Sequence, residues 1–395
     1  MKNLAYGISL VMILLVPSGE FLKSSLGTAG LFVGALLGGV WLAGVFLTGQ
    51  TRKFSLFHGA VIVFLLWHVL SVFWSINVDA SVTRVFNLTR KLLLTIILWD
   101  LYTRRERIRA GLQAFVLGAY VPVLSTISNY VAATHGEWTR YSSSGNNSNS
   151  TAIIITFAIP LAVHLAFSPA PDSWRKWASV LRAANYVFIP AALFGVALTG
   201  TRFTLVMSVP TLIFFVVTVQ RLKPAARIPA FVAVGITIIV VLSAVPESLI
   251  QRLGSVQEEV THGDFDGRTL YWYEGIQVWM DHPLTGVGAK TFPEAVPSGR
   301  SAHNSFIAIL TELGLVGLIL FGVVLLIASM CAWRQPPSDM YFWITVFVVL
   351  LIGNLPMTYA YMRATWLLLG LLVASSGLPV DSTIDPQLAT QREAP

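Results

Sequence analysis

Arg202, Arg268 and His303 lie just outside apolar stretches of this 395-residue chain, and their side chains could together bind an anion. A guanidinium group can hold phosphate oxygens through two hydrogen bonds. An imidazole, with an ordinary pKa of about 6.5, can accept a proton from a hydroxyl group. A cation at a bilayer surface is tolerated when it reaches the headgroups or binds an anion. Three such residues on one face predict a site for a negatively charged, lipid-linked substrate.

The composition places the chain in a membrane. It is 55% hydrophobic and 11% charged, whereas soluble domains contain about 25% charged residues. The net charge of +7 is attributed to loops that face an anionic cytoplasmic leaflet, so the expected partners include membrane lipids and no nucleic acid. The single cysteine, Cys331, excludes an intrachain disulfide and a cysteine-based zinc site. The histidines follow no zinc-binding pattern, and we expect neither a metal nor another cofactor.

Twelve apolar stretches predict an all-α integral membrane protein in which residues 1–376 form one polytopic domain. A helix needs about 20 residues to cross the hydrocarbon core. The first stretch is interpreted as a membrane helix because no small-x-small cleavage site follows it. The predicted spans are residues 4–16, 26–47, 57–74, 88–101, 111–131, 151–167, 184–199, 203–219, 229–245, 304–332, 340–358 and 361–375. Residues 377–395 are expected to form a disordered cytoplasmic tail.

The lysines and arginines of the short loops predict which way the chain is oriented. Most of them lie on the same side of the predicted membrane as both termini, and the positive-inside rule makes that side cytoplasmic. Two longer segments, 132–150 and 246–303, then face outward, and the second is the predicted catalytic loop. Within it, a helix is predicted from about Arg268 to Asp281, where Pro283 stops it.

This predicted helix is amphipathic. Leu270, Tyr273, Ile276 and Met280 share one face at helical spacing, with further aromatic residues beside them. Such a helix is typical of the membrane interface, where aromatic side chains collect. A helix that packs against the bundle fits the pattern equally well.

Each of the three cations is expected at the N-terminus of a helix. Arg268 opens the helix just described, Arg202 follows a predicted N-cap at Thr201, and His303 precedes Asn304 at the start of the tenth span. Helix N-termini carry unpaired amide groups and the positive end of the helix dipole, which favour an anion. In the alternative interpretation, the arginines contact lipid headgroups or pair with acids of the long loop, namely Glu247, Asp264 and Asp266.

A second set of polar side chains could extend the anion site. Arg84, Arg90 and Lys91 lie near the outer end of the fourth span, and Arg140 precedes a Ser/Asn-rich segment at 142–150. Together with Asn304 they are candidate contacts for a diphosphate or a lipid. Anchoring of basic side chains in the membrane interface accounts for the cations equally well.

The segment Gly286-Val-Gly-Ala-Lys290 is similar to a nucleotide-binding loop in composition alone. A P-loop has glycine directly before its lysine, and here that residue is Ala289. The segment is therefore predicted to be a tight turn that returns the chain to the site.

The sequence around these residues resembles the O-antigen ligase and O-antigen polymerase superfamily of bacterial envelope glycosyltransferases. The likeness covers about residues 140–324. One departure is Phe203 after Arg202, where relatives often have glycine. The likeness is carried by Gly200-Thr-Arg202, by Arg268 through Trp272 to His282-Pro-Leu-Thr-Gly-Val-Gly288, and by His303-Asn-Ser-Phe-Ile-Ala-Ile-Leu-Thr-Glu312-Leu-Gly314-Leu-Val-Gly317.

The resemblance implies a ligase that transfers polysaccharide from undecaprenyl diphosphate to lipid A–core oligosaccharide, at the periplasmic face of the bacterial inner membrane, without nucleotide or metal. Arg202 and Arg268 would stabilise the diphosphate leaving group. His303 would accept the proton of the attacking hydroxyl group or donate a hydrogen bond to the diphosphate. Polymerisation of O-antigen is the nearest alternative, and transfer to a protein acceptor is another. A transporter is disfavoured because the spans are largely free of charge near the midplane.

Overall fold

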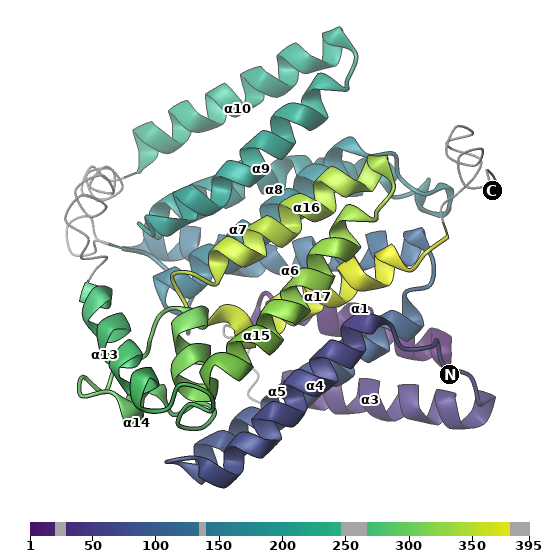
Figure 1. Ribbon diagram of the computed structural model, residues 1–395. Coiled ribbons are helices and arrows are strands. Elements are labelled where there is room, and N and C mark those ends of the chain that lie inside the picture. Colours follow the sequence, from purple (N-terminus) through teal and green to yellow (C-terminus); the bar gives the residue numbers. More distant parts are fainter. Residues whose placement is uncertain (20–28, 134–139, 246–266, 380–395) are drawn as a thin grey trace, which may run out of the picture.

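In the computed structural model, the described part of the chain consists of helices joined by turns and loops (Figure 1). The structure describes residues 1–19, 29–133, 140–245 and 267–379, so Glu247, Asp264, Asp266 and the predicted tail from 380 onward lie outside the described residues. The α-helices are α1 (Lys2–Leu15), α3 (Ala29–Thr48), α4 (Leu56–Ser71), α5 (Val78–Leu101), α6 (Arg105–Ala132), α7 (Ser148–Phe167), α8 (Ala178–Leu198), α9 (Phe203–Gln220), α10 (Pro224–Ala244), α13 (Arg268–Asp281), α14 (Phe292–Ala295), α15 (Ser305–Trp333), α16 (Pro337–Gly353) and α17 (Arg363–Ser376). The 3₁₀ helices are η1 (Val72–Trp74), η2 (Asp172–Trp174) and η4 (Tyr359–Tyr361).

Within the described ranges, 8 helices are long and apolar enough to cross a membrane, which makes the chain a multi-pass membrane protein. They are α3, α4 with η1, α6, α7, α8, α9, α10 and α15. Three further predicted spans correspond to the shorter apolar helices α1, α16 and α17. The remaining one, 88–101, is the second half of α5. That helix carries Asp79, Arg84, Arg90, Lys91 and Asp100, and this charge keeps it from qualifying as a span by composition. Of the twelve predicted spans, eight therefore correspond to helices that are long and apolar enough to cross a membrane.

The position of a helix in the bundle follows its sequence only in part. α7 lies at the centre, and 89% of its apolar stretch is buried. α10 is just as apolar, yet none of its apolar stretch is buried, and it stands at the edge of the bundle (Figure 1). A helix that is apolar all round can face either protein or lipid, so hydropathy by itself does not separate the two.

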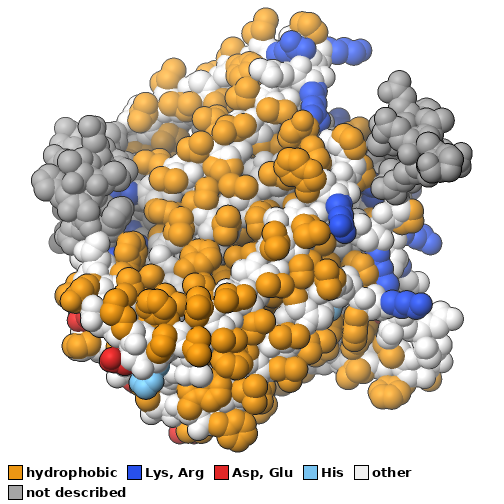
Figure 2. Space-filling model, viewed as in Figure 1, with side chains coloured by type: hydrophobic (Ala, Val, Ile, Leu, Met, Phe, Trp, Pro, Cys, Tyr) orange, Lys and Arg blue, Asp and Glu red, His pale blue; other side chains and the backbone are white. Residues whose placement is uncertain are grey.

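The two ends of the bundle differ in charge. At one end, which we call the basic end, Lys2 Nζ lies 3.0 Å from Asp100 Oδ2, and Arg52 donates to the Gly377 carbonyl. α1 therefore begins where α5 and α17 end. Figure 2 shows Lys and Arg side chains along the upper and right-hand edges of this face of the molecule, with apolar side chains over the middle. At the other end, the site end, α7, α9, α13 and α15 begin.

α15 is broken at Gly314, and the segment 283–288 docks against the break. Gly314 has φ 68° and ψ −170°, outside the helical region. Inside a membrane, backbone groups freed by such a break need protein partners. Here Gly288 N donates to the Glu312 carbonyl over 2.8 Å, and Leu315 N donates to the Pro283 carbonyl over 2.9 Å. The predicted tight turn at 286–290 is thus held against α15, just inside the site end.

α13 packs against the bundle, and its place in the membrane interface stays a prediction. It spans Arg268–Asp281, as predicted. Its Gly275 is buried, and the Gly275 carbonyl accepts a hydrogen bond of 3.0 Å from Thr311 Oγ1 of α15. Leu270, Tyr273 and Met280 are exposed on the opposite face. One face of the helix therefore packs on the bundle, and the other presents apolar side chains to the surroundings.

Candidate functional site

His303 is held in a strained conformation directly before α15. Its φ of 46° is left-handed, which non-glycine residues rarely adopt and which costs about 1–2 kcal/mol. The next residue, Asn304, is the N-cap of α15, and its Oδ1 accepts hydrogen bonds from Phe306 N at 2.8 Å and Ile307 N at 3.1 Å. Asn304, predicted to contact substrate, therefore uses this oxygen to fix the helix start. That cap and the strained turn together set the direction of the imidazole.

The segment from Asn354 to Ala360 is pinned beside His303 by Ser305. Ser305 Oγ donates to Asn354 Oδ1 at 2.7 Å, and Ala360 N donates to Ser305 Oγ at 3.0 Å. Within this segment, Met357 Sδ lies 3.3 Å from His303 Nδ1. The turn between α16 and α17 thus forms one wall of the site.

Arg268 reaches the same turn from α13. It is the first residue of that helix, after Gly267 in a left-handed conformation, and its Nη1 donates to the Pro356 carbonyl over 2.9 Å. The pKa of His303 lies below its ordinary value, because of burial first and then because of the positive charges of Arg268 and Arg300. The structure therefore places Arg268 and His303 against the same turn, and the lowered pKa favours the neutral imidazole.

Arg202 stands at the start of α9, but the predicted N-cap at Thr201 is wrong. The N-cap is Arg202 itself, and it makes no side-chain capping bond. The Thr201 hydroxyl points elsewhere and lies 3.1 Å from Arg140 Nη2. Arg140 Nε also donates to the Thr199 carbonyl over 2.9 Å. Arg140, predicted to bind substrate, thus holds the turn that precedes Arg202.

A short series of contacts connects Arg202 to the wall of the site. Met207, in the second turn of α9, packs against Gly353 at the end of α16, where an added Cβ would lie 3.2 Å from the Met207 methyl group. The next residue is Asn354, which binds Ser305. Arg202 therefore lies at the same end of the bundle as Arg268 and His303, ahead of a helix that packs against α16, and α16 leads into the turn that they share.

Arg84, Arg90 and Lys91 form a second cationic group, and Arg363 belongs to it. Lys91 is only 8% exposed, and it lies within electrostatic range of those three arginines. Such crowding of positive charge is unfavourable unless an anion relieves it. Arg363 was missed in the sequence because it follows the apolar Met362 at the start of α17; its place just ahead of an apolar run was the available signal.

Arg84 connects this group to α15. Its guanidinium carbon lies 3.6 Å from the centre of the Tyr361 ring, a cation–π contact. The positive charge of Arg84 also acts on the carboxyl group of Glu312, which is 3% exposed. Oε1 of Glu312 accepts a hydrogen bond of 3.4 Å from Phe292 N. Glu312 belongs to the motif at 303–317 and had no predicted role; in the structure it is a buried acid within electrostatic range of Arg84.

Residues 186–322 match the family model described as O-antigen ligase. This range contains Arg202, Arg268 and His303, and it confirms the resemblance read from the sequence. The chain is also similar to the exopolysaccharide production protein ExoQ of Rhizobium meliloti (strain 1021), with 33% identity over 129 residues. That match covers 28% of this chain and 28% of the length of ExoQ.

Proposed function

We propose that this chain, which carries an O-antigen ligase family region at 186–322, is a membrane glycosyltransferase that moves polysaccharide from undecaprenyl diphosphate to lipid A–core oligosaccharide. The observation that carries the proposal is that Arg268 and His303 both contact the turn 356–357, at the end of the bundle where Arg202 precedes α9. In this proposal the site end faces the periplasm, and the basic end faces the cytoplasm of a bacterial inner membrane, as the positive-inside rule favours.

The cations would act on the leaving group. When the bond between the sugar C1 and the phosphate oxygen breaks, the electron pair and the negative charge go to the diphosphate. Arg202 and Arg268, each at the start of a helix, would stabilise that charge where water is scarce. Arg84, Arg90, Lys91 and Arg363 would hold the carrier's phosphates before and after the bond breaks.

His303 would be the base. A hydroxyl oxygen of the acceptor forms the new bond to C1 from the face opposite the diphosphate, and its proton passes to the imidazole. Nδ1 lies against Met357 Sδ, so Nε2 is assigned to receive the proton. A depressed pKa keeps the ring ready to accept a proton at neutral pH. Direct attack inverts the configuration at C1.

A second candidate function is extension of a polysaccharide chain instead of its final transfer. It uses the same donor and the same leaving group, and it differs only in the acceptor. The observation that favours it is the similarity to ExoQ, whose name refers to exopolysaccharide production. The residues proposed here would serve both reactions without change.

Deletion of the gene separates these functions. If the chain is a ligase, the lipopolysaccharide shows bare core on a gel, and full-length polymer accumulates on the carrier lipid. If it extends O-antigen, the core carries single repeat units; if it extends an exopolysaccharide, secreted polymer is lost and the core is unaltered. Complementation with the wild type should restore the product, and Arg268→Ala should not. Unaltered glycans of every kind would contradict both functions.

A further inference from the structure

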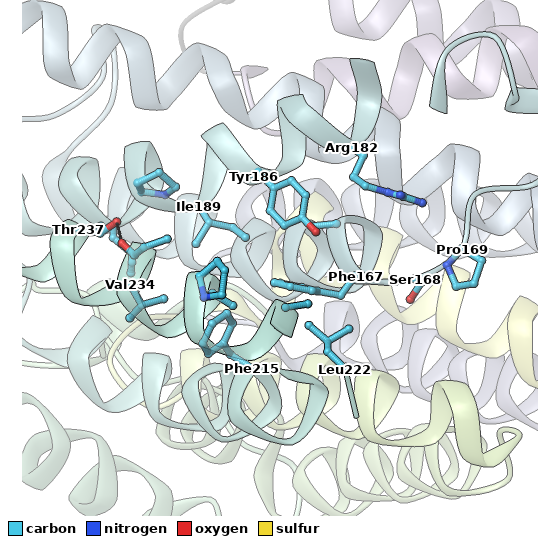
Figure 3. A pocket seen from close by; sticks show the side chains of 17 residues that line it. Phe167, Ser168, Pro169, Arg182, Tyr186, Ile189, Phe215, Leu222, Val234 and Thr237 are labelled. Atoms are coloured by element: carbon cyan, nitrogen blue, oxygen red, sulfur yellow. Dashed lines mark hydrogen bonds between the residues drawn. The ribbon is translucent and has the colours of Figure 1, made fainter. Parts of the chain in front are cut away.

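A cavity of about 620 Å³ lies between α8 and α10, away from the site just described (Figure 3). Its floor is aromatic. Phe167, at the end of α7, makes edge-to-face contacts with Tyr186 of α8 and with Phe215 of α9, at ring-centre distances of 5.3 and 5.9 Å. The cavity begins at the basic end, where Ser168 and Pro169 follow α7. It is therefore remote from the helix starts that carry Arg202 and His303.

The main walls are faces of α8 and α10, two helices that contact each other over only part of their length. Arg182, Tyr186, Ile189 and Leu193 line the cavity from α8 at spacings of four, three and four residues. α10 contributes small side chains at the same kind of spacing, including Ala226, Ala230 and Ala233. Small residues usually allow two membrane helices to pack closely. Here they leave a groove, and α10 consequently has no buried residues in its apolar stretch.

The length of the groove fits one leaflet. The lining of α8 extends from Arg182 to Leu193, 11 helical steps of 1.5 Å, or about 16 Å. The hydrocarbon core of a bilayer is about 30 Å thick, so the length of the groove is about half the thickness of the core. An acyl chain that enters from the basic end would end near the bilayer midplane.

The charge at the mouth fits an anion. Arg182 is exposed and lies at the basic end of the groove (Figure 3). The adjoining loops hold further cations and a single acid, Asp172. The loop cations are Arg175, Lys176, Arg221 and Lys223, and Arg227 lies in the first turn of α10. Basic pockets between membrane helices on the cytoplasmic side bind acidic lipid headgroups.

We propose that this groove binds an anionic phospholipid of the leaflet at the basic end, with one acyl chain between α8 and α10 and its phosphate on Arg182. The chain would fill the groove, add to the limited contact that α10 makes with α8, and hold α10 in place. A polyprenyl carrier is a poorer occupant, because its diphosphate belongs at the opposite end in the proposed reaction. The lipid is therefore a structural ligand and not the donor.

Native mass spectrometry of the purified full chain tests the proposal, with phosphatidylglycerol or phosphatidylethanolamine of identical acyl chains added in turn. We expect one phosphatidylglycerol to be retained in preference to phosphatidylethanolamine. Arg182→Ala should weaken its binding about fivefold, since one cation near the surface contributes about 1 kcal/mol. Arg334→Ala, which removes an exposed cation of the same end outside the groove, should leave binding unaltered.

Two substitutions test whether the acyl chain lies in the groove. Ala230→Trp fills the cavity and should abolish the preferential retention, and Ala233→Leu should weaken it with less risk to folding. The unfolding temperature of each variant without lipid shows that it is folded. Equal retention of both lipids, equal effects of Arg182→Ala and Arg334→Ala, or full retention by a folded Ala230→Trp variant would each overturn the proposal. None of these readouts depends on glycosyl transfer.

Discussion

Arg268 and His303, 35 positions apart in the chain, contact consecutive residues of one turn: Arg268 Nη1 lies 2.9 Å from the Pro356 carbonyl oxygen, and His303 Nδ1 lies 3.3 Å from Met357 Sδ. The turn fixes the guanidinium group next to the imidazole. This proximity makes the imidazole harder to protonate, because a second positive charge would be placed beside the first.

The first prediction concerns pH. Transfer should fall in acid with a midpoint below about 6.5, the ordinary pKa of histidine, because the folded protein depresses the pKa of His303. Arg300→Gln removes one of the two positive charges responsible, so the protonated ring is less disfavoured and the midpoint should move up. Arg300→Lys keeps the charge and serves as the matched control. Initial rates of transfer at saturating donor across pH 5–8 measure this. If the wild type, Arg300→Gln and Arg300→Lys all had the same midpoint, His303 would not be the titrating group.

The arginines at the helix starts should matter for rate more than for folding. Arg268→Ala and Arg202→Lys are each expected to reduce transfer by about 10²–10³-fold, the usual cost of losing one group that stabilises developing negative charge. Expression level and membrane insertion should stay normal. Lys53→Ala, an exposed cation at the basic end, should retain full activity. If Arg202→Lys retained it too, a bidentate contact of Arg202 with phosphate would be ruled out.

Lys91→Met should separate stability from donor binding. Removing an ammonium group buried among three arginines relieves repulsion, so the thermal unfolding temperature without substrate should rise. Donor affinity should fall about tenfold, since a hydrogen bond to a charged group contributes about 1.5–3 kcal/mol. Lys53→Met is the control for the loss of a lysine. A variant with lower stability and unaltered donor affinity would show that Lys91 is a structural residue only.

Glu312 and Arg84 should be energetically coupled. Glu312→Gln keeps an acceptor for Phe292 N but removes the negative charge that faces Arg84. In a double-mutant cycle with Arg84→Gln, we expect a coupling energy of about 0.5–3 kcal/mol in the free energy of unfolding. Glu294→Gln, on the neighbouring helix α14, exposed and hydrogen-bonded to Asn77, should show no coupling to Arg84. Additive effects for Glu312 would remove it as the partner of the cationic group.

The break in α15 should tolerate no side chain. In Gly314→Ala, the new Cβ would lie 2.2 Å from the carbonyl carbon of Leu284, in a backbone conformation already strained for alanine. We expect a loss of about 1–3 kcal/mol in stability from strain alone, and more from displacement of the docked segment. Gly322→Ala, on the same helix with open space around it, should be neutral. Equal unfolding temperatures for the two variants would contradict the docking of 283–288 at the break.

Local sequence was sufficient to predict that the chain is helical and to place several helix ends. Apolar runs, glycines and prolines determine where a helix starts and stops, so α13 was predicted from Arg268 to Asp281, and His303 was placed directly ahead of α15. These features depend on neighbours a few residues away. The count of spans was less secure, because the charge of α5 and the short α1, α16 and α17 fall near the limit at which composition distinguishes a membrane helix.

Contacts between distant segments were decided by the tertiary structure. Neighbouring residues do not predict that the Thr201 hydroxyl contacts Arg140 and makes no cap for α9. They also do not predict that Arg363 lies within electrostatic range of Lys91. Nor does hydropathy reveal that a loop 25 or more residues upstream satisfies the backbone at Gly314. Such pairings depend on how helices pack, and packing is set by shape complementarity across the whole bundle. The sequence alone therefore indicated which side chains could bind an anion. Which of these side chains lie at the same site was determined only by the folded structure.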